Sequence, residues 1–190
     1  MAYDGIEVEL KVMLEPREAE SLARRLSEIG ERVDARHQVD DYYSPVTRSF
    51  LDAEFPFEWL SLRARDGKSV LNYKHFHPEG AEKHTHCDEW ETEVDRPDEL
   101  ERILDALGIS RVVRVEKRRT TYRLPGFEIA LDEVVDLGDF IEIEATIDQG
   151  GVDETREALL RLASDLGLRL EETDLRGYPY QLLARMGLVK

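Results

Sequence analysis

Charged side chains recur at alternate positions along several predicted strands. In residues 5–14, Glu7, Glu9 and Lys11 alternate with apolar residues. Because successive strand side chains point to opposite faces, these three share one face. Later segments repeat the pattern. The acidic members of the charged faces are Glu7, Glu9, Glu89, Glu91, Asp132, Glu142 and Glu144, and the basic members are Lys11, Arg63, Arg65, Lys74, Lys117 and Arg119.

The nearly balanced charge of these faces limits where they can lie. A dry core cannot hold them, because each unpaired buried ion costs several kcal/mol. They are therefore either exposed and salt-bridged on the surface, or they line a wet barrel interior that binds a charged ligand. A polyphosphate would use both signs. Arg and Lys neutralise phosphate oxygens, and carboxylates hold Mg²⁺ or Mn²⁺ ions that bridge to the phosphates.

The elements that would position these residues are mostly antiparallel strands. Residues Asp66 and Gly67 are a strong hairpin signal, residues 44–57 read as a loop, and apolar residues recur at helical spacing elsewhere. We predict a single α+β domain over residues 1–190. The expected strands are residues 5–14, 36–43, 59–65, 69–77, 86–95, 110–124, 127–135 and 139–148, and the expected helices are residues 16–29, 97–107, 152–166 and 178–186.

Composition narrows the classes of partner. The net charge is −16, with 42 acidic and 26 basic residues, which disfavours a nucleic-acid-binding protein. The longest apolar runs are too short to span a membrane. The single cysteine, Cys87, cannot form an internal disulfide and fits a reducing cytoplasm. Only 6 of the 26 basic residues are Lys, which suggests either a salt-loving source or simply a soluble acidic surface.

Taken together, the charged motifs resemble those of the CYTH superfamily, which is named after class IV adenylyl cyclase and thiamine triphosphatase. The resemblance covers nearly the whole chain and includes a tyrosine-containing closing helix near Tyr178. The motifs that carry it, in order, are Glu7-x-Glu9-x-Lys11, Gln38-x-Asp40-x-Tyr42, Leu62-Arg63-x-Arg65, Tyr73-Lys74, Glu89-x-Glu91, Lys117-x-Arg119, Leu131-Asp132-x-Val134 and Leu137-Gly138-x-Phe140-x-Glu142-Ile143-Glu144.

This resemblance implies a fold and a set of roles. The fold is a closed antiparallel eight-stranded β-barrel, the triphosphate tunnel, with helices packed outside. Glu89 and Glu91 would orient the basic residues or take part in metal binding. The implied ligands of Mg²⁺ or Mn²⁺ are Glu7, Glu9, Asp132, Glu142 and Glu144. The implied phosphate-binding residues are Lys11, Arg63, Arg65, Lys74, Lys117 and Arg119, of which Lys11, Arg63, Lys74 and Arg119 would also be catalytic.

Three functions remain open at this stage. The chain length, the Gln38-x-Asp40 motif and the Leu137–Glu144 motif look most like the class IV adenylyl cyclase branch, which converts ATP to cyclic AMP and pyrophosphate. The alternative is a triphosphatase acting on tripolyphosphate, a nucleoside triphosphate or thiamine triphosphate. The third is a noncatalytic module that binds nucleotide or polyphosphate. A homodimer is compatible with each.

The aromatic and histidine residues give weaker expectations. By alternation from Lys74 and Glu89, we expect four histidines on the outside of one hairpin, as either a transition-metal site or a solvated tip. The four are His75, His77, His84 and His86. Trp59 and Trp90 are expected in the core, with base stacking by either as the less favoured alternative.

Overall fold

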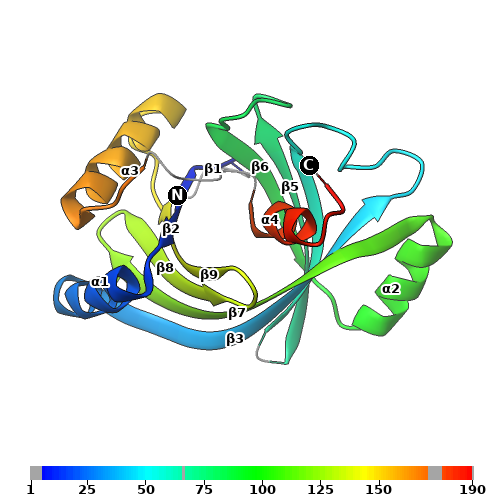
Figure 1. Cartoon of the computed structure of the whole chain (residues 1–190), viewed down its shortest axis with the longest axis horizontal. Helices are drawn as coiled ribbons and strands as arrows, with labels where there is room; N and C mark the ends of the chain where they lie inside the picture. Colours follow the sequence, from blue (N-terminus) through cyan, green and yellow to red (C-terminus); the bar gives the residue numbers. More distant parts are fainter. Residues whose placement is uncertain (1–5, 66, 171–176, 190) are drawn as a thin grey trace.

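Nine antiparallel strands form one sheet that curls into a nearly closed barrel (Figure 1). The computed structural model describes residues 6–65, 67–170 and 177–189. Around the barrel the strand order is β1-β6-β5-β4-β3-β7-β8-β9-β2. The strands within the described residues are β1 (Ile6–Glu7), β2 (Glu9–Leu14), β3 (Glu31–Pro45), β4 (Glu58–Arg65), β5 (Lys68–His77), β6 (His86–Glu93), β7 (Ile109–Leu124), β8 (Phe127–Val134) and β9 (Gly138–Ala145).

The first predicted strand closes the barrel by pairing with both edges of the sheet. It divides at Val8, so that β1 pairs with β6 while β2 pairs with β9. Val8 is 1% exposed, and its carbonyl oxygen accepts a hydrogen bond from Ala145 N. Tilted barrel strands are staggered, so one segment meets different neighbours over its two halves. The predicted barrel is thus confirmed, with one expected strand counted as two; Gly5 lies outside the described residues.

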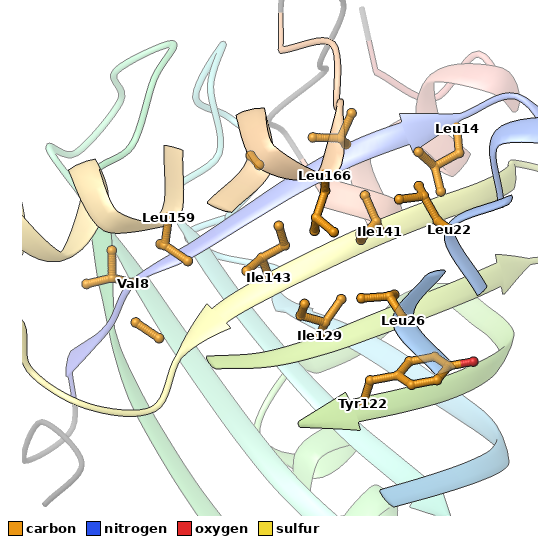
Figure 2. Close-up of a cluster of buried hydrophobic side chains, with 13 residues drawn as sticks. Val8, Leu14, Leu22, Leu26, Tyr122, Ile129, Ile141, Ile143, Leu159 and Leu166 are labelled. Carbon is orange, nitrogen blue, oxygen red and sulfur yellow. The ribbon is translucent and has the colours of Figure 1, made fainter. Parts of the chain in front are cut away.

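Two helices cover the outer face of β2, β8 and β9 (Figure 1). These are α1 (Pro16–Ile29) and α3 (Val152–Leu166). In Figure 2, Leu22 of α1 and Leu159 of α3 pack toward Ile141 and Ile143 of β9, which are fully buried. Since Ile141 and Ile143 face outward into this core, Glu142 and its alternate neighbours face the barrel interior.

The other two helices lie at different places on the barrel. The helix α2 (Pro97–Ala106) packs near β7, and α4 (Gly177–Arg185) covers one end of the barrel (Figure 1). In α4, Tyr178 and Leu183 are buried against Val113 and Phe140. The position of α4 therefore brings Tyr178 to the barrel interior. No helix within the described ranges is both long enough and apolar enough to cross a membrane.

The expectation that both tryptophans are buried was confirmed for Trp59 and wrong for Trp90. Trp90 is 57% exposed and stacks on Tyr73 outside the barrel, with ring centroids 5.7 Å apart. Trp59 is buried, but it lies on the inner face, on the same side of β4 as Arg63. Strand alternation alone places Trp59 with Arg63, whereas the expectation followed the general preference of tryptophan for apolar surroundings.

Candidate active site in the barrel cavity

The barrel encloses a cavity of about 270 Å³ that is lined by charged side chains. Cross-strand neighbours bring predicted residues together, because Glu9 pairs with Glu144, Lys11 with Glu142 and Lys74 with Glu89. Twelve of the thirteen predicted site residues line this cavity. They are Glu7, Glu9, Lys11, Arg63, Arg65, Lys74, Glu89, Glu91, Lys117, Arg119, Glu142 and Glu144.

Most of the carboxylates and the arginines occupy opposite sides of the cavity. Strands β8, β9, β2, β1 and β6 are consecutive around the barrel, and so are β4, β3 and β7. We call the carboxylates of the first group the acidic wall: Glu7, Glu9, Glu89, Glu91, Glu128, Glu142 and Glu144. We call the cations of the second group the basic wall: Arg36, Arg63, Arg65, Lys117 and Arg119.

Two lysines lie against the acidic wall. Lys74 Nζ contacts Glu7 Oε2, and it is 3.6 Å from both Glu9 Oε2 and Glu89 Oε1. Burial alone would lower the pKa of Lys74, but these three carboxylates raise it well above its ordinary value. Lys11 Nζ is 3.0 Å from Glu142 Oε2. Both lysines therefore carry fixed positive charge at neutral pH.

Asp132 is the one predicted ligand that does not line the cavity. It is 2% exposed and lies behind the basic wall, where Arg119 donates from Nε at 2.7 Å and from Nη2 at 2.6 Å. Its Oδ2 also accepts from Lys117 Nζ at 3.1 Å and from the Tyr178 hydroxyl at 2.9 Å. Three side chains thus donate four hydrogen bonds to the two oxygens of Asp132. This arrangement suits a residue that orients the basic wall better than it suits a metal ligand.

Lys117 is the cation of the basic wall that loses its proton most readily. Burial, and after it the charge of Arg119, lower the pKa of Lys117 to about 8, although Asp132 opposes the shift. The ring of Tyr178 lies 5.1 Å from Lys117 Nζ and 4.6 Å from Lys11 Nζ. The aromatic face of Tyr178 therefore contacts two ammonium groups that project into the cavity.

Comparison with known proteins shows the family of this chain. A sequence model of the CYTH domain matches residues 5–178. The chain belongs to the CYTH domain family. A Methanocaldococcus jannaschii protein named as a proposed adenylate cyclase is 25% identical over 175 residues, which is 91% of this chain and 96% of that protein. The adenylate cyclase CyaB of Aeromonas hydrophila is 32% identical over 82 residues, 43% of each chain.

A solved structure supports the same assignment. The chain resembles a Pyrococcus horikoshii protein with a TM-score of 0.77 and 30% identity, covering 95% of this chain and 99% of that one. The resemblance inferred from the charged motifs is thereby confirmed. Because the match extends over nearly the whole length of both chains, the barrel and its helices are those of a CYTH domain.

The acidic wall of this CYTH domain has the charge and chemistry to hold a divalent cation. Glu9 Oε2 is buried and has no hydrogen-bond partner among the described residues, and burial raises the pKa of Glu9. Burial, with Glu7 and Glu142 nearby, raises the pKa of Glu144 to about 8. Within the described chain no three carboxylates are arranged to hold a metal ion. The ammonium group of Lys74 instead contacts Glu7, Glu9 and Glu89. A hard cation would relieve this excess negative charge.

Several residues that line the CYTH cavity were not among the predicted site residues, although Asp40 and Tyr42 belong to one of the motifs. Arg36 extends the basic wall, and its Nε is buried without a hydrogen-bond partner in the described chain. Asp40 accepts a hydrogen bond from Arg63 Nε at 3.1 Å, and Asn72 donates to Glu91 at 3.1 Å. Alternation offered a signal for each, since all three lie two residues from another inward position. The remaining missed residues include Tyr42, Trp59, Phe76, His84 and Glu128.

The histidines divide into two places. His77 stacks between His75 and His86 on the hairpin, with ring centroids 4.8 and 4.9 Å apart. His84 instead packs on Phe76, at 5.1 Å, and lines the cavity. The outward expectation was wrong for His84 and His86, which both line the cavity; β6 begins at His86, so strand alternation does not extend before it.

Proposed function

We propose that this CYTH domain is a divalent-metal-dependent enzyme that binds a triphosphate in the barrel cavity, and that its substrate is ATP, cyclised to cyclic AMP and pyrophosphate. The observation that carries the proposal is the opposition of the basic wall to the acidic wall. Neither a dry core nor a simple cation-binding site requires five cations facing seven carboxylates across one cavity.

The basic wall suits the phosphate chain. Arg63 and Arg119 present planar guanidinium groups, whose N–H donors beyond those held by Asp40, Glu91 and Asp132 can bind phosphate oxygens. The buried Arg36 Nε is a donor without a partner in the described chain, as expected where an anion completes the site. Lys11 and Lys74 add fixed charge from the opposite side. During cyclisation the ribose 3′ oxygen attacks the α-phosphorus and pyrophosphate leaves, so these cations would offset the charge that develops on pyrophosphate.

The carboxylates suit a metal. Glu7, Glu9 and Glu144 would hold Mg²⁺ or Mn²⁺, because Glu9 Oε2 has no hydrogen-bond partner within the described residues and burial raises the pKa of Glu144 to about 8, while Glu7 lies beside them. Glu142 already pairs with Lys11 and Arg119, so it would contribute mainly by orienting them. A bound divalent cation would polarise phosphoryl oxygens and neutralise part of the triphosphate charge. Asp132 would hold Lys117 and Arg119 in position from behind.

The cyclase assignment draws on the relatives. The proteins from M. jannaschii and A. hydrophila both carry the name adenylate cyclase, and the first matches almost the full length of this chain. A triphosphatase would use the same two walls but would direct water at the terminal phosphorus. The products therefore decide between the two.

Phosphorus NMR distinguishes the possible reactions. The protein is incubated with ATP, and separately with tripolyphosphate, in Mg²⁺ or Mn²⁺ and in both low and high KCl. We expect cyclic AMP and pyrophosphate from ATP. ADP with orthophosphate would replace the cyclase by a triphosphatase acting in the same cavity. Unchanged spectra with both substrates would refute the enzymatic proposal and leave a binding module.

A matched pair of variants tests the metal assignment. Glu9→Ala removes a carboxylate of the acidic wall, and we expect it to abolish metal-dependent turnover while the fold persists. Glu133→Ala removes an exposed carboxylate from β8 and should leave turnover unchanged. Wild-type turnover by Glu9→Ala would overturn the assignment of Glu9.

A further inference from the structure

Aromatic side chains gather at one end of the cavity. Tyr42 of β3, Trp59 of β4 and Phe76 of β5 come from three neighbouring strands. The strand registers place the three residues near one another. Tyr42 pairs with Ser61, two residues from Trp59, and Trp59 pairs with Lys74, two residues from Phe76. The rings of Tyr42 and Trp59 meet edge to face, with centroids 5.8 Å apart. The three rings therefore form an aromatic patch at this end of the cavity, beside Lys74, which pairs opposite Trp59.

Three arginines of the basic wall lie toward the other end. Along β4, Arg63 and Arg65 follow Trp59 by four and six residues, which is about 13 and 20 Å at the rise of a strand. Along β3, Arg36 is likewise separated from Tyr42 by six residues. The cavity thus changes along its length from aromatic to strongly basic. A ligand that matches it carries a flat apolar group at one end and several negative charges at the other.

His84 adds a polar group to the aromatic end. Its ring packs on Phe76, with centroids 5.1 Å apart and the planes tilted by 36°. The Nε2 atom of His84 is buried, yet within the described chain it has no hydrogen-bond partner. A buried polar atom without a partner is unfavourable, so a ligand that supplies the partner is stabilised. Burial and the nearby His77 also lower the pKa of His84, so the imidazole is neutral at pH 7 and offers both a donor and an acceptor.

We infer that Trp59, Phe76 and His84 form a subsite for the base of a nucleoside triphosphate, in which Phe76 contacts the face of the base and His84 Nε2 hydrogen-bonds its edge. The inference rests on the proposed function, because the base reaches this end only when the phosphates lie against the arginines. The subsite makes the cavity selective for nucleotides over inorganic tripolyphosphate, which has no group to fill it.

Two uncleavable ligands isolate the contribution of the base. They are the bis-methylene analogue of tripolyphosphate and the corresponding analogue of ATP, whose carbon bridges prevent loss of phosphate or pyrophosphate. Dissociation constants are measured by calorimetry with Mg²⁺. Stacking of a base on an aromatic side chain contributes about 1–3 kcal/mol, so Phe76→Ala should weaken the ATP analogue roughly tenfold or more. The tripolyphosphate analogue should change by less than about twofold.

Further variants separate the parts of the subsite. His84→Ala should also weaken the ATP analogue selectively. Phe76→Tyr keeps the ring and should bind both ligands like the wild type. Trp90→Ala removes an exposed aromatic ring from the outer face of β6 and should change neither.

The outcomes distinguish failure of the base subsite from failure of the proposed function. Selective loss of the ATP analogue in Phe76→Ala and His84→Ala supports the base subsite. Equal weakening of both ligands, or no change in either, overturns the subsite but leaves triphosphate binding intact. A wild-type protein that binds neither ligand overturns the proposed function itself, and the subsite with it.

Discussion

Replacing Asp132 by Asn removes one buried negative charge and keeps the shape of the side chain. In the wild type, Asp132 accepts two hydrogen bonds from Arg119, one from Lys117 and one from Tyr178. The amide keeps one accepting oxygen and turns an NH₂ group toward these donors, so at least one donor loses its partner. Breaking a buried ion pair in this way costs about 3–5 kcal/mol, because the remaining cations are uncompensated.

Urea denaturation at pH 7 measures this loss directly. We expect Asp132→Asn to lower the free energy of unfolding by about 3–5 kcal/mol and the melting temperature by roughly 10 °C, given about 2–4 °C per kcal/mol for a chain of this size. Adding Lys117→Met removes one uncompensated cation and should recover about 1 kcal/mol. Binding of Mn²⁺ without substrate, followed by electron paramagnetic resonance, should stay within about twofold of wild type.

Two results would refute this reasoning. A loss of stability below about 1 kcal/mol would mean that the four contacts of Asp132 are not the buried ion-pair network described above. A large loss of Mn²⁺ affinity would mean that Asp132 is a metal ligand after all, as the sequence motif implied, and that its side chain turns into the cavity when a metal binds.

Three further predictions concern charge. Because the pKa of Lys117 is about 8, its positive charge is present below pH 8 and lost above it, so the dissociation constant of tripolyphosphate should rise by up to about tenfold per pH unit above pH 8. The Lys117→Met variant should bind tripolyphosphate more weakly at pH 7 and with a smaller pH dependence. An unaltered pH profile in this variant would contradict the assignment. Glu9→Gln should weaken Mn²⁺ binding by roughly tenfold or more. It should not lower the melting temperature of the metal-free protein, since Glu9 Oε2 has no hydrogen-bond partner within the described residues. Unchanged Mn²⁺ affinity would remove Glu9 from the metal site. The net charge of −16 predicts that the melting temperature, followed by circular dichroism, rises across a KCl series; a constant value would remove the argument for a salt-loving protein.

Alternation predicted most of the inner face correctly, because side-chain direction in a strand depends only on position. Twelve predicted residues, from Glu7 to Glu144, line the cavity for this reason. Alternation gives the face of a side chain but not its depth. Asp132 faces inward as predicted, but Tyr178 and Lys117 cover it, and the place of Tyr178 depends on how α4 packs.

Other features depended on tertiary pairing that the sequence does not display locally. The strand β3 extends over Glu31–Pro45, well beyond the predicted residues 36–43, because β7 pairs with it along its whole length. His84 precedes its strand, so its position was set by packing on Phe76 and not by alternation. The aromatic end of the cavity became visible only when the registers of β3, β4 and β5 were known.

The split first strand has a consequence for the order of folding. Glu7 pairs opposite Cys87, and Glu9 pairs opposite Glu144, so both parts of the split strand have partners far along the sequence. Contacts so distant in sequence form late, because the long intervening loops cost entropy to close. The acidic wall therefore does not exist in any partly folded form that lacks β1 and β2 in place. Closure of the barrel and completion of the acidic wall are a single event.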